Sequence, residues 1–335
     1  MTERVSASVE KSHPDIGFVA IGRNEGMRLE RCLSSLLKQS DRIIYVDSGS
    51  HDDSVDIATR LGVFVLKLSN NESYTAARSR NEGFSTLKER WPDIDHVMFI
   101  DGDCALADGF PEAGIEALRA SKDIGVVTGR CRELRPDATI YNRLCEMEWN
   151  GPIGDIDACG GIFMTSTDVF ESVNGFNPAV IAAEDDDFCI RVRAAGYKIR
   201  RIDHDLCFHD ADMRHFSQWW RRAIRAGHAY AQVSEMHPGY FAGPRRRAWL
   251  WGLVLPVVVL VAAPFTNGWS FALLALYGLS FVRTRAKLIK QGAYPSHAGL
   301  HAGFLTLSKF PNLIGIVDYR RKRMFKRDVA IVEYK

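Results

Sequence analysis

The feature that most constrains the fold is an alternation of short apolar runs with helical patterns between residues 16 and 128. The runs predicted as strands are Ile16–Ile21, Arg42–Val46, Val63–Leu66, His96–Ile100 and Ile124–Thr128. Between them, apolar side chains recur at helical spacing, as at Leu29, Leu33 and Leu36. Because strands and helices alternate with tight connections, the sequence predicts an α/β fold with a mostly parallel sheet and helices on both faces.

Two acidic positions, Asp47 and Asp101, each directly follow a predicted strand. In sheets of this type, ligands bind beyond the carboxyl ends of the strands. The second position begins Asp101-Gly102-Asp103, where two carboxylates flank a glycine and can both reach one divalent cation. Such hard oxygen ligands suit Mg²⁺ or Mn²⁺. Taken alone, this turn is better explained as a solvated acidic loop, so the surrounding motifs decide its meaning.

The acidic turn stands in a series of polar motifs whose order along the chain is informative. The other motifs are Gly22-Arg23-Asn24-Glu25, Val46-Asp47-Ser48-Gly49-Ser50, Ser79-Arg80-Asn81-Glu82-Gly83 and Glu184-Asp185. Together they resemble the family 2 glycosyltransferases of the GT-A fold, which is Rossmann-like, over roughly residues 15–230. Processive members carry a final tryptophan in a Gln-x-x-Arg-Trp motif, whereas this chain has Gln218-Trp219-Trp220-Arg221-Arg222. The resemblance therefore implies a non-processive, membrane-associated enzyme that adds one sugar.

The resemblance also implies a nucleotide-sugar donor, a UDP- or GDP-sugar, and a divalent metal cofactor, Mn²⁺ or Mg²⁺. The residues implied to bind the donor are Gly22, Glu25, Asp47, Arg80, Asp101 and Asp103. Asp103 would be the main metal ligand, with Asp101 and His209 also near the metal or the diphosphate. The family's second acid in Asp-Asp-Gly-Ser is Ser48 here, so recognition of the base would depend on Asp47.

The acidic pair Glu184-Asp185 is implied to be catalytic, with Asp185 as the general base. An acceptor hydroxyl is a poor nucleophile until its proton is removed in the transition state. One direct displacement with inversion at the anomeric carbon is the implied course. The acids continue to Asp187, and Asp186 or Asp187 could instead serve as the base or cap the following helix. Gly160-Gly161 is expected to let the backbone approach the acceptor, or to form a plain tight turn.

The composition changes after about residue 238. Two stretches without a charge, Trp249–Phe265 and Trp269–Val282, are flanked by Arg245-Arg246-Arg247 and by Arg283. This pattern fits a helical hairpin with both ends cytoplasmic, although each stretch is short for a bilayer span. A pair of buried helices and an interfacial segment are the alternatives. We therefore divide the chain into a polar tail (1–14), a catalytic domain (15–238) and a helical, membrane-associated region with a basic tail (239–335).

The predicted function is an inverting glycosyltransferase that acts on a polyprenyl-linked or other glycan acceptor at a membrane, in cell-surface glycan or exopolysaccharide synthesis. The polar N-terminus has no apolar signal region, so the catalytic domain is expected in the cytoplasm, at the inner membrane if the cell is bacterial. The alternatives are a sugar-phosphate nucleotidyltransferase and a non-catalytic, membrane-associated nucleotide-sugar-binding protein.

Other classes of protein fit the sequence poorly. A net charge of +2 gives no support to a nucleic-acid partner. The seven cysteines are scattered without a CxxC pair, which indicates neither a zinc site nor a redox motif. No GxGxxG follows the first strand, so a dinucleotide-dependent oxidoreductase is disfavoured.

Overall fold

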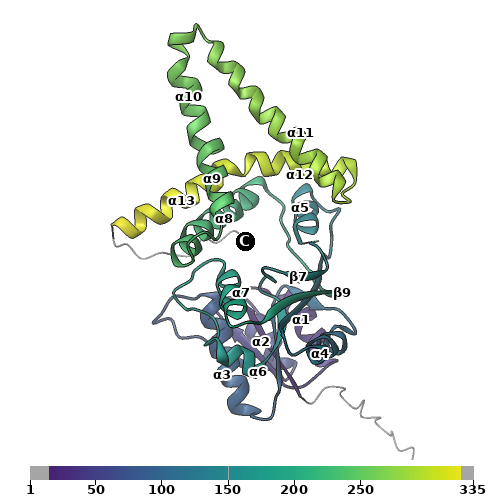
Figure 1. The fold of residues 1–335 in the computed structure, drawn as a ribbon. Helices are drawn as coiled ribbons and strands as arrows, with labels where there is room; N and C mark the ends of the chain where they lie inside the picture. The colour runs from purple at the N-terminus through teal and green to yellow at the C-terminus, as the bar shows by residue number, and fades with distance from the viewer. Residues whose placement is uncertain (1–14, 150, 326–335) are drawn as a thin grey trace, which may run out of the picture. The chain divides into compact units, whose positions relative to one another are not determined.

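The computed structural model describes residues 15–149 and 151–325, so the predicted tail 1–14 and the basic Lys326-Arg327 lie outside the described residues (Figure 1). The chain forms two compact units, which we call the sheet unit and the helical unit. The sheet unit comprises Met1–Leu134, Trp149–Pro178 and Glu184–Ala211, and the helical unit comprises Arg135–Glu148, Ala179–Ala183 and Asp212–Lys335.

The sheet unit is built on a nine-stranded sheet in the order β3-β2-β1-β4-β8-β6-β9-β5, with β7 paired to β9. Its strands are β1 (Ile16–Gly22), β2 (Ile43–Asp47), β3 (Phe64–Lys67), β4 (His96–Asp101), β5 (Cys104–Leu106), β6 (Ile124–Glu133), β7 (Gly154–Ile156), β8 (Phe163–Ser166) and β9 (Lys198–His209). All five strands predicted between residues 16 and 128 are present.

The expectation of a mostly parallel sheet is correct for only part of it. Strands β1 to β4 are parallel to one another, but β8 runs antiparallel between β4 and β6. Strands β5 and β7 also pair antiparallel, both with β9. The sheet is therefore mixed, although β6 and β9 pair parallel to each other.

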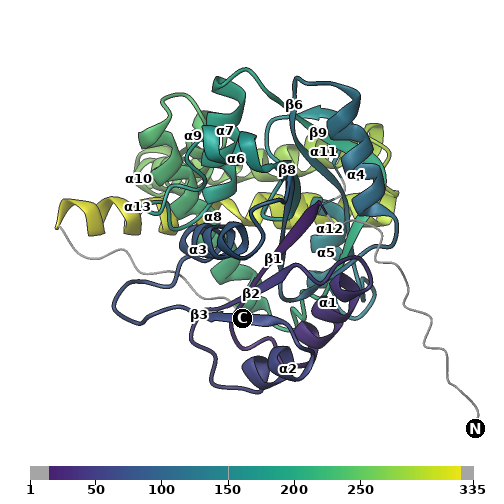
Figure 2. The same ribbon diagram turned by 90° about the horizontal axis from the view of Figure 1, so that it is seen from below.

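Helices cover both faces of this sheet. They are α1 (Met27–Leu37), α2 (Ser54–Arg60), α3 (Ala76–Arg90), α4 (Phe110–Ala120), α6 (Thr167–Ser172) and α7 (Glu184–Ala194). Alternate residues of β1 point to opposite sides: Phe18 joins a core with Leu29 and Leu33 of α1, whereas Val19 joins a second core with Phe84 of α3. Figure 2 shows α1 and α3 on opposite sides of β1 and β2. All seven cysteines are free thiols, and six of them are buried.

The helical unit contains α5 (Ile140–Trp149), α8 (Phe216–Met236), α9 (Ala242–Trp249), a π-helical turn (Leu250–Val254), α10 (Leu255–Ala262), two 3₁₀ turns (Pro264–Thr266 and Trp269–Leu274), α11 (Ala275–Lys290), α12 (Pro295–Leu307) and α13 (Lys309–Met324). Helix α8 falls inside the predicted domain 15–238, yet it groups with these C-terminal helices. The reason is close packing, since a Cβ on Gly227 of α8 would lie 2.0 Å from the Asn312 carbonyl oxygen of α13.

Helices α10 and α11 form a hairpin that reverses at Asn267 and Gly268, both in left-handed backbone conformations (Figure 1). The first apolar stretch is not one regular helix, because a π-helical turn precedes α10. The second residue of α10 is Pro256, which lacks the backbone N–H that a helix requires. Among residues 15–149 and 151–325, we find no helix with both the length and the apolar character needed to cross a membrane.

Candidate functional site

The predicted donor-binding residues at the ends of β1, β2 and β4 lie on one edge of the sheet. In the parallel register, Gly22 of β1 pairs with Asp47 of β2, and Ile21 of β1 pairs with Asp101 of β4. The motifs that end these three strands are therefore neighbours, although they are separated by up to 79 positions in the sequence. The carboxyl end of this part of the sheet is the candidate site.

The loop after β1 is fixed to the loop after β2. The Asn24 backbone N–H donates to Ser50 Oγ at 2.9 Å, and Asn24 Oδ1 accepts from the His51 N–H at 2.8 Å. The backbone N–H groups of Glu25 and Gly26 both donate to Ser54 Oγ at 3.0 Å. Two motifs that the sequence presents separately thus form one wall of the site.

Asp47 is buried, and its carboxylate is held by its own strand and turn. Its Oδ2 accepts from the backbone N–H groups of Gly49 at 3.1 Å and Ser50 at 3.0 Å, while the Tyr45 hydroxyl donates to Oδ1 at 3.2 Å. Glu25, predicted to line the same pocket, lies 3.0 Å from the Arg28 guanidinium. The orientation of Asp47 is therefore set before any ligand binds.

Arg80 of α3 is a deeply buried charge of the site, with 2% of its side chain exposed. Its Nη1 donates to Glu184 Oε1 at 2.6 Å, and its Nη2 donates to Asp101 Oδ1 at 2.9 Å. Burial lowers the pKa of this guanidinium, but the carboxylates of Asp101 and Glu184 raise it more, so the pKa is raised overall. Arg80 remains charged and links the turn after β4 to the start of α7.

Gly161 lies directly against the guanidinium of Arg80. A Cβ at this position would lie 2.3 Å from Arg80 Nη2, closer than real atoms approach. The glycine therefore leaves room for the guanidinium, which also lies 5.3 Å from the centre of the Phe176 ring. The Gly160-Gly161 segment serves the buried ion pairs of Arg80 as well as forming a turn.

The four acids at the start of α7 are in different environments. Glu184 is paired with Arg80, and Asp187 Oδ2 accepts from Arg191 Nε at 2.9 Å. Burial, followed by the charges of Asp186 and Glu184, raises the pKa of Asp185 to about 8. A carboxyl group with a pKa near neutrality can accept and release protons at working pH. Asp185 is therefore a candidate for proton transfer.

A second cluster lies where β5 begins and where β6 and β9 end. Asp103, Cys104 and His209 present ligand atoms that all lie within 4.8 Å of one another. His209 Nε2 is 3.3 Å from Asp103 Oδ2, and its Nδ1 is 3.9 Å from Glu133 Oε2. Burial raises the pKa of the Cys104 thiol, so the oxygen and imidazole atoms are the better ligands.

The structure thus brings Asp103 and His209 together, as predicted, but joins Asp101 to Arg80 rather than to this cluster. Glu133 is the functional candidate that the sequence reasoning missed. It is buried at the end of β6, and its Oε2 accepts from the Ala211 N–H at 3.2 Å. The predicted strand Ile124–Thr128 stopped short of Glu133, and no motif marks this residue.

Comparisons with known proteins bear on these clusters. Residues 19–169 match the model of "Glycosyl transferase family 2", and residues 143–216 match "N-terminal domain of galactosyltransferase". Residues 19–169 are therefore similar to a family 2 glycosyltransferase domain. The first match contains Asp47, Arg80, Asp101 and Asp103, and the second contains α7 and His209.

Two further similarities, one in sequence and one in structure, are distant. The "Pre-mycofactocin glycosyltransferase" of Mycobacterium tuberculosis is 25% identical over 244 residues, which cover 68% of this chain and 49% of that protein. The chain therefore spans about half the length of this curated relative. The mannosyltransferase PcManGT from Pyrobaculum calidifontis, solved with GDP-Man and Mn²⁺, matches with a TM-score of 0.55 and 17% identity, over 94% of this chain and 88% of that one. This likeness establishes a shared GT-A fold.

Proposed function

We propose that the protein is an inverting glycosyltransferase that moves a sugar from a nucleotide-diphosphate-sugar donor to a lipid-linked or polysaccharide acceptor. The observation that carries the proposal is the network in which Arg80 connects Asp101, in the turn after β4, with Glu184, beside Asp185. This network links the expected donor side of the site to the expected acceptor side within the sheet unit. The family match supplies the reaction class.

On the donor side, Asp47 would accept a hydrogen bond from the nucleotide base, with Gly22 and Glu25 lining the same pocket. The fixed loops after β1 and β2 support this role, because a preorganised acceptor loses little freedom on binding. A UDP- or GDP-sugar is the proposed donor class.

The residues of the second cluster fit a divalent metal, because a carboxylate and an imidazole are common ligands of Mn²⁺. Asp103 and His209 would hold the ion, and Glu133 would orient the imidazole from its other nitrogen. When bound, the metal would neutralise the charge that develops on the diphosphate leaving group.

On the acceptor side, Asp185 would accept the proton of the acceptor hydroxyl. The hydroxyl oxygen forms a bond to the anomeric carbon while the bond between that carbon and the diphosphate oxygen breaks, and the electron pair leaves with the nucleotide. Glu184 and Arg80 would act as positioning residues, since their ion pair fixes the start of α7. A single displacement of this kind inverts the anomeric configuration.

The test is an assay of the purified chain with Mn²⁺ and a panel of UDP- and GDP-sugars. We expect at least one donor to be turned over, activity to disappear with EDTA, and Asp103→Asn to lose at least about 100-fold. The matched control is Asp203→Asn, because Asp203 lies on the same strand as His209 but is 74% exposed and pairs only with Arg130 among described residues. Donor binding without any transfer would instead favour a non-catalytic binding protein.

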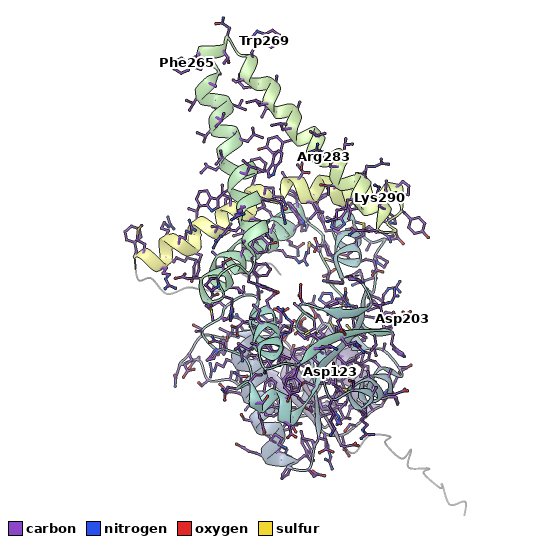
Figure 3. All side chains as sticks on the ribbon, viewed as in Figure 1. Asp123, Asp203, Phe265, Trp269, Arg283 and Lys290 are labelled. Atoms are coloured by element: carbon purple, nitrogen blue, oxygen red, sulfur yellow. The ribbon has the colours of Figure 1, made fainter. Side chains whose placement is uncertain are left out.

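We also propose that the helical unit associates with a membrane through the hairpin of α10 and α11, the catalytic domain lying on the cytoplasmic side. Support comes from its exposed apolar surface: Phe265 and Trp269 at the tip are 84% and 80% exposed (Figure 3). Arg283 and Lys290 lie further along α11, where they could meet headgroups.

Flotation with lipid vesicles tests this association. Replacing Phe265 and Trp269 with serine should weaken binding by about tenfold or more, because each apolar side chain buried in lipid contributes roughly 1.5–3 kcal/mol. Tyr294→Ser is the matched control, since Tyr294 is 74% exposed on the same unit but lies outside the hairpin. Equal binding by all variants would contradict the proposal.

A further inference from the structure

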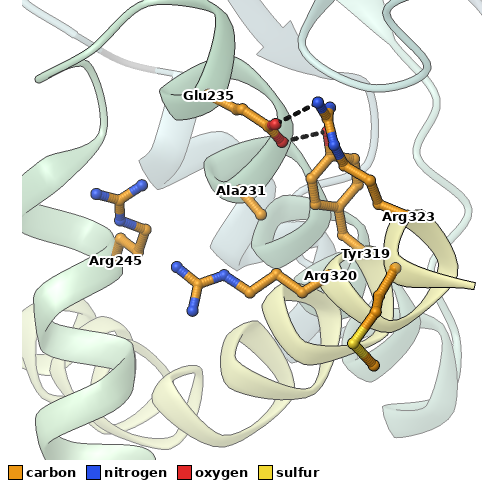
Figure 4. Close-up of a pocket in the computed structure, with 7 residues that line it drawn as sticks. Ala231, Glu235, Arg245, Tyr319, Arg320 and Arg323 are labelled. Atoms are coloured by element: carbon orange, nitrogen blue, oxygen red, sulfur yellow. Dashed lines mark hydrogen bonds and ion pairs between the residues drawn. The ribbon is translucent and has the colours of Figure 1, made fainter.

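A separate pocket lies within the helical unit, where α8, α9 and α13 meet (Figure 4). Its volume is about 380 Å³, within the range of small-molecule sites. The polar side chains that line it are Glu235 of α8, Arg245 of α9, and Tyr319, Arg320 and Arg323 of α13. None of these residues has a part in the proposed transfer of sugar.

The wall of this pocket is built by close helix packing rather than by mobile side chains. Gly315 of α13 leaves no room for a Cβ, which would lie 2.0 Å from the Ile224 carbonyl oxygen of α8. Ala231, Ala248 and Tyr319 belong to one buried apolar cluster at the same junction. The three helices therefore hold the arginine-bearing positions in fixed relation to one another.

The charges in the pocket are unbalanced in favour of an anion. Arg323 Nη2 lies 2.6 Å from Glu235 Oε1, and the Tyr319 hydroxyl donates to Glu235 Oε2 at 2.9 Å. Both oxygens of the only acid lining the pocket are thus engaged within the described part of the chain.

Arg245 and Arg320 have no carboxylate partner among residues 15–149 and 151–325, and the Arg320 guanidinium lies 5.5 Å from the centre of the Trp249 ring. Figure 4 shows both guanidinium groups on the same side of the pocket. Two arginines that share a pocket and lack an acid are a strong arrangement for an anion with several oxygens.

We propose that this pocket binds a phosphate group, with Arg245 and Arg320 as its main donors and with Arg323 held in place by Glu235. The guanidinium fork matches the spacing of phosphate oxygens, which makes phosphate a better ligand than a single-point anion. The phosphate could belong to a lipid headgroup or to a free phosphate compound. Helix α9 continues directly into the exposed apolar segment that begins at Leu250, so a headgroup is the source that the arrangement favours.

The inference goes beyond glycosyl transfer and requires no turnover, so its failure and that of the proposed function are distinguishable. The test compares Arg245→Gln/Arg320→Gln with Arg246→Gln/Arg321→Gln in the full-length chain. Arg246 and Arg321 are exposed next neighbours on the same two helices and do not line the pocket. Both double variants change the net charge equally, so general attraction to an anionic surface is matched.

The probes are inorganic pyrophosphate, titrated by calorimetry, and phosphatidylcholine vesicles with or without phosphatidic acid. We expect the pocket variant to bind about tenfold or more weakly than the control variant, because only the pocket variant loses charge-assisted contacts from the guanidinium groups to the phosphate oxygens. If the pocket variant loses affinity only for vesicles with phosphatidic acid, the pocket is a headgroup site. If it also loses affinity for pyrophosphate, the pocket is a site for free phosphates.

Equal losses in both double variants would overturn the proposal, because they would show only a diffuse basic surface. Failure of the unsubstituted chain to bind either probe would overturn it as well. The single variant Arg320→Lys guards against a folding defect, since it keeps the charge of an exposed side chain and removes only the fork. It should bind more weakly than the unsubstituted chain, with an unchanged melting temperature.

Discussion

The two units of the protein treat charge and apolar surface in opposite ways. The sheet unit buries a guanidinium and several carboxylates, among them Arg80, Glu184 and Asp103. The helical unit leaves large apolar side chains such as Phe265 and Trp269 in solvent. Buried charge is costly unless it is paired, and large exposed apolar patches on soluble proteins mark interaction sites. The function proposed for each unit therefore depends on residues that depart from an ordinary core and surface.

The largest expected effect is a loss of activity caused by a substitution in the sheet unit. Asp185→Asn should lower kcat by about 100- to 10,000-fold, because the amide keeps the shape of the side chain and cannot take the acceptor's proton. The measurement is steady-state transfer with the donor that proves active. Donor affinity should change little, which separates a lost base from a lost fold, and a fully active variant would remove Asp185 from the mechanism.

The pH dependence of the unsubstituted enzyme also tests Asp185 as the general base. Because the pKa of Asp185 is raised to about 8, the group is mostly protonated below that pH and unable to act as a base. We expect kcat/KM to rise with pH and to level off above about pH 8. Flat kcat/KM between pH 6 and 8 would contradict the assignment.

The next largest effect concerns the stability of the buried ion pairs. Arg80→Met removes one guanidinium and leaves Asp101 and Glu184 without it, which should cost about 3–5 kcal/mol in the free energy of unfolding. Arg60→Met is the control, because Arg60 is exposed and its ion pair with Glu30 is long, at 3.6 Å. The control should lose no more than about 1 kcal/mol in urea unfolding. Similar losses in both variants would show that burial of the charge is unimportant.

The sheet unit also shows how far sequence reasoning reaches. Strands β1 to β4 follow from local apolar runs, and their parallel pairing follows from the helices between them. Strand β9 could not be found in this way, since its residues Lys198–His209 mix charges with apolar positions and pair with β6, more than sixty residues earlier. The distant pairing also explains why Glu133 was missed, because only the β6–β9 register brings it beside His209.

The sequence predicted the positions of site residues that directly follow strands. It did not predict contacts between side chains that are distant in the sequence. Sequence placed Asp47 and Asp101 on one edge, but it could not show that Arg80 would bind both Asp101 and Glu184. Nor could the sequence show that Gly161 lies beside Arg80, because this contact depends on the direction in which the Arg80 side chain extends through the core. In the helical unit, the apolar hairpin was visible in the composition, whereas the grouping of α8 with α13 depends on packing.

The smallest effect separates the packed side of the helical unit from its exposed side. Gly227→Ala would place a Cβ 2.0 Å from the Asn312 carbonyl oxygen, and we expect it to cost about 1–3 kcal/mol. Gly278→Ala on α11 has nothing within 4 Å and should stabilise the chain by roughly 0.5–1 kcal/mol, because alanine favours a helix over glycine. The same chemical change should therefore shift the melting temperature in opposite directions. Two losses of equal size would mean that α11 is as tightly packed as α8, and the contrast between the unit's two sides would not hold.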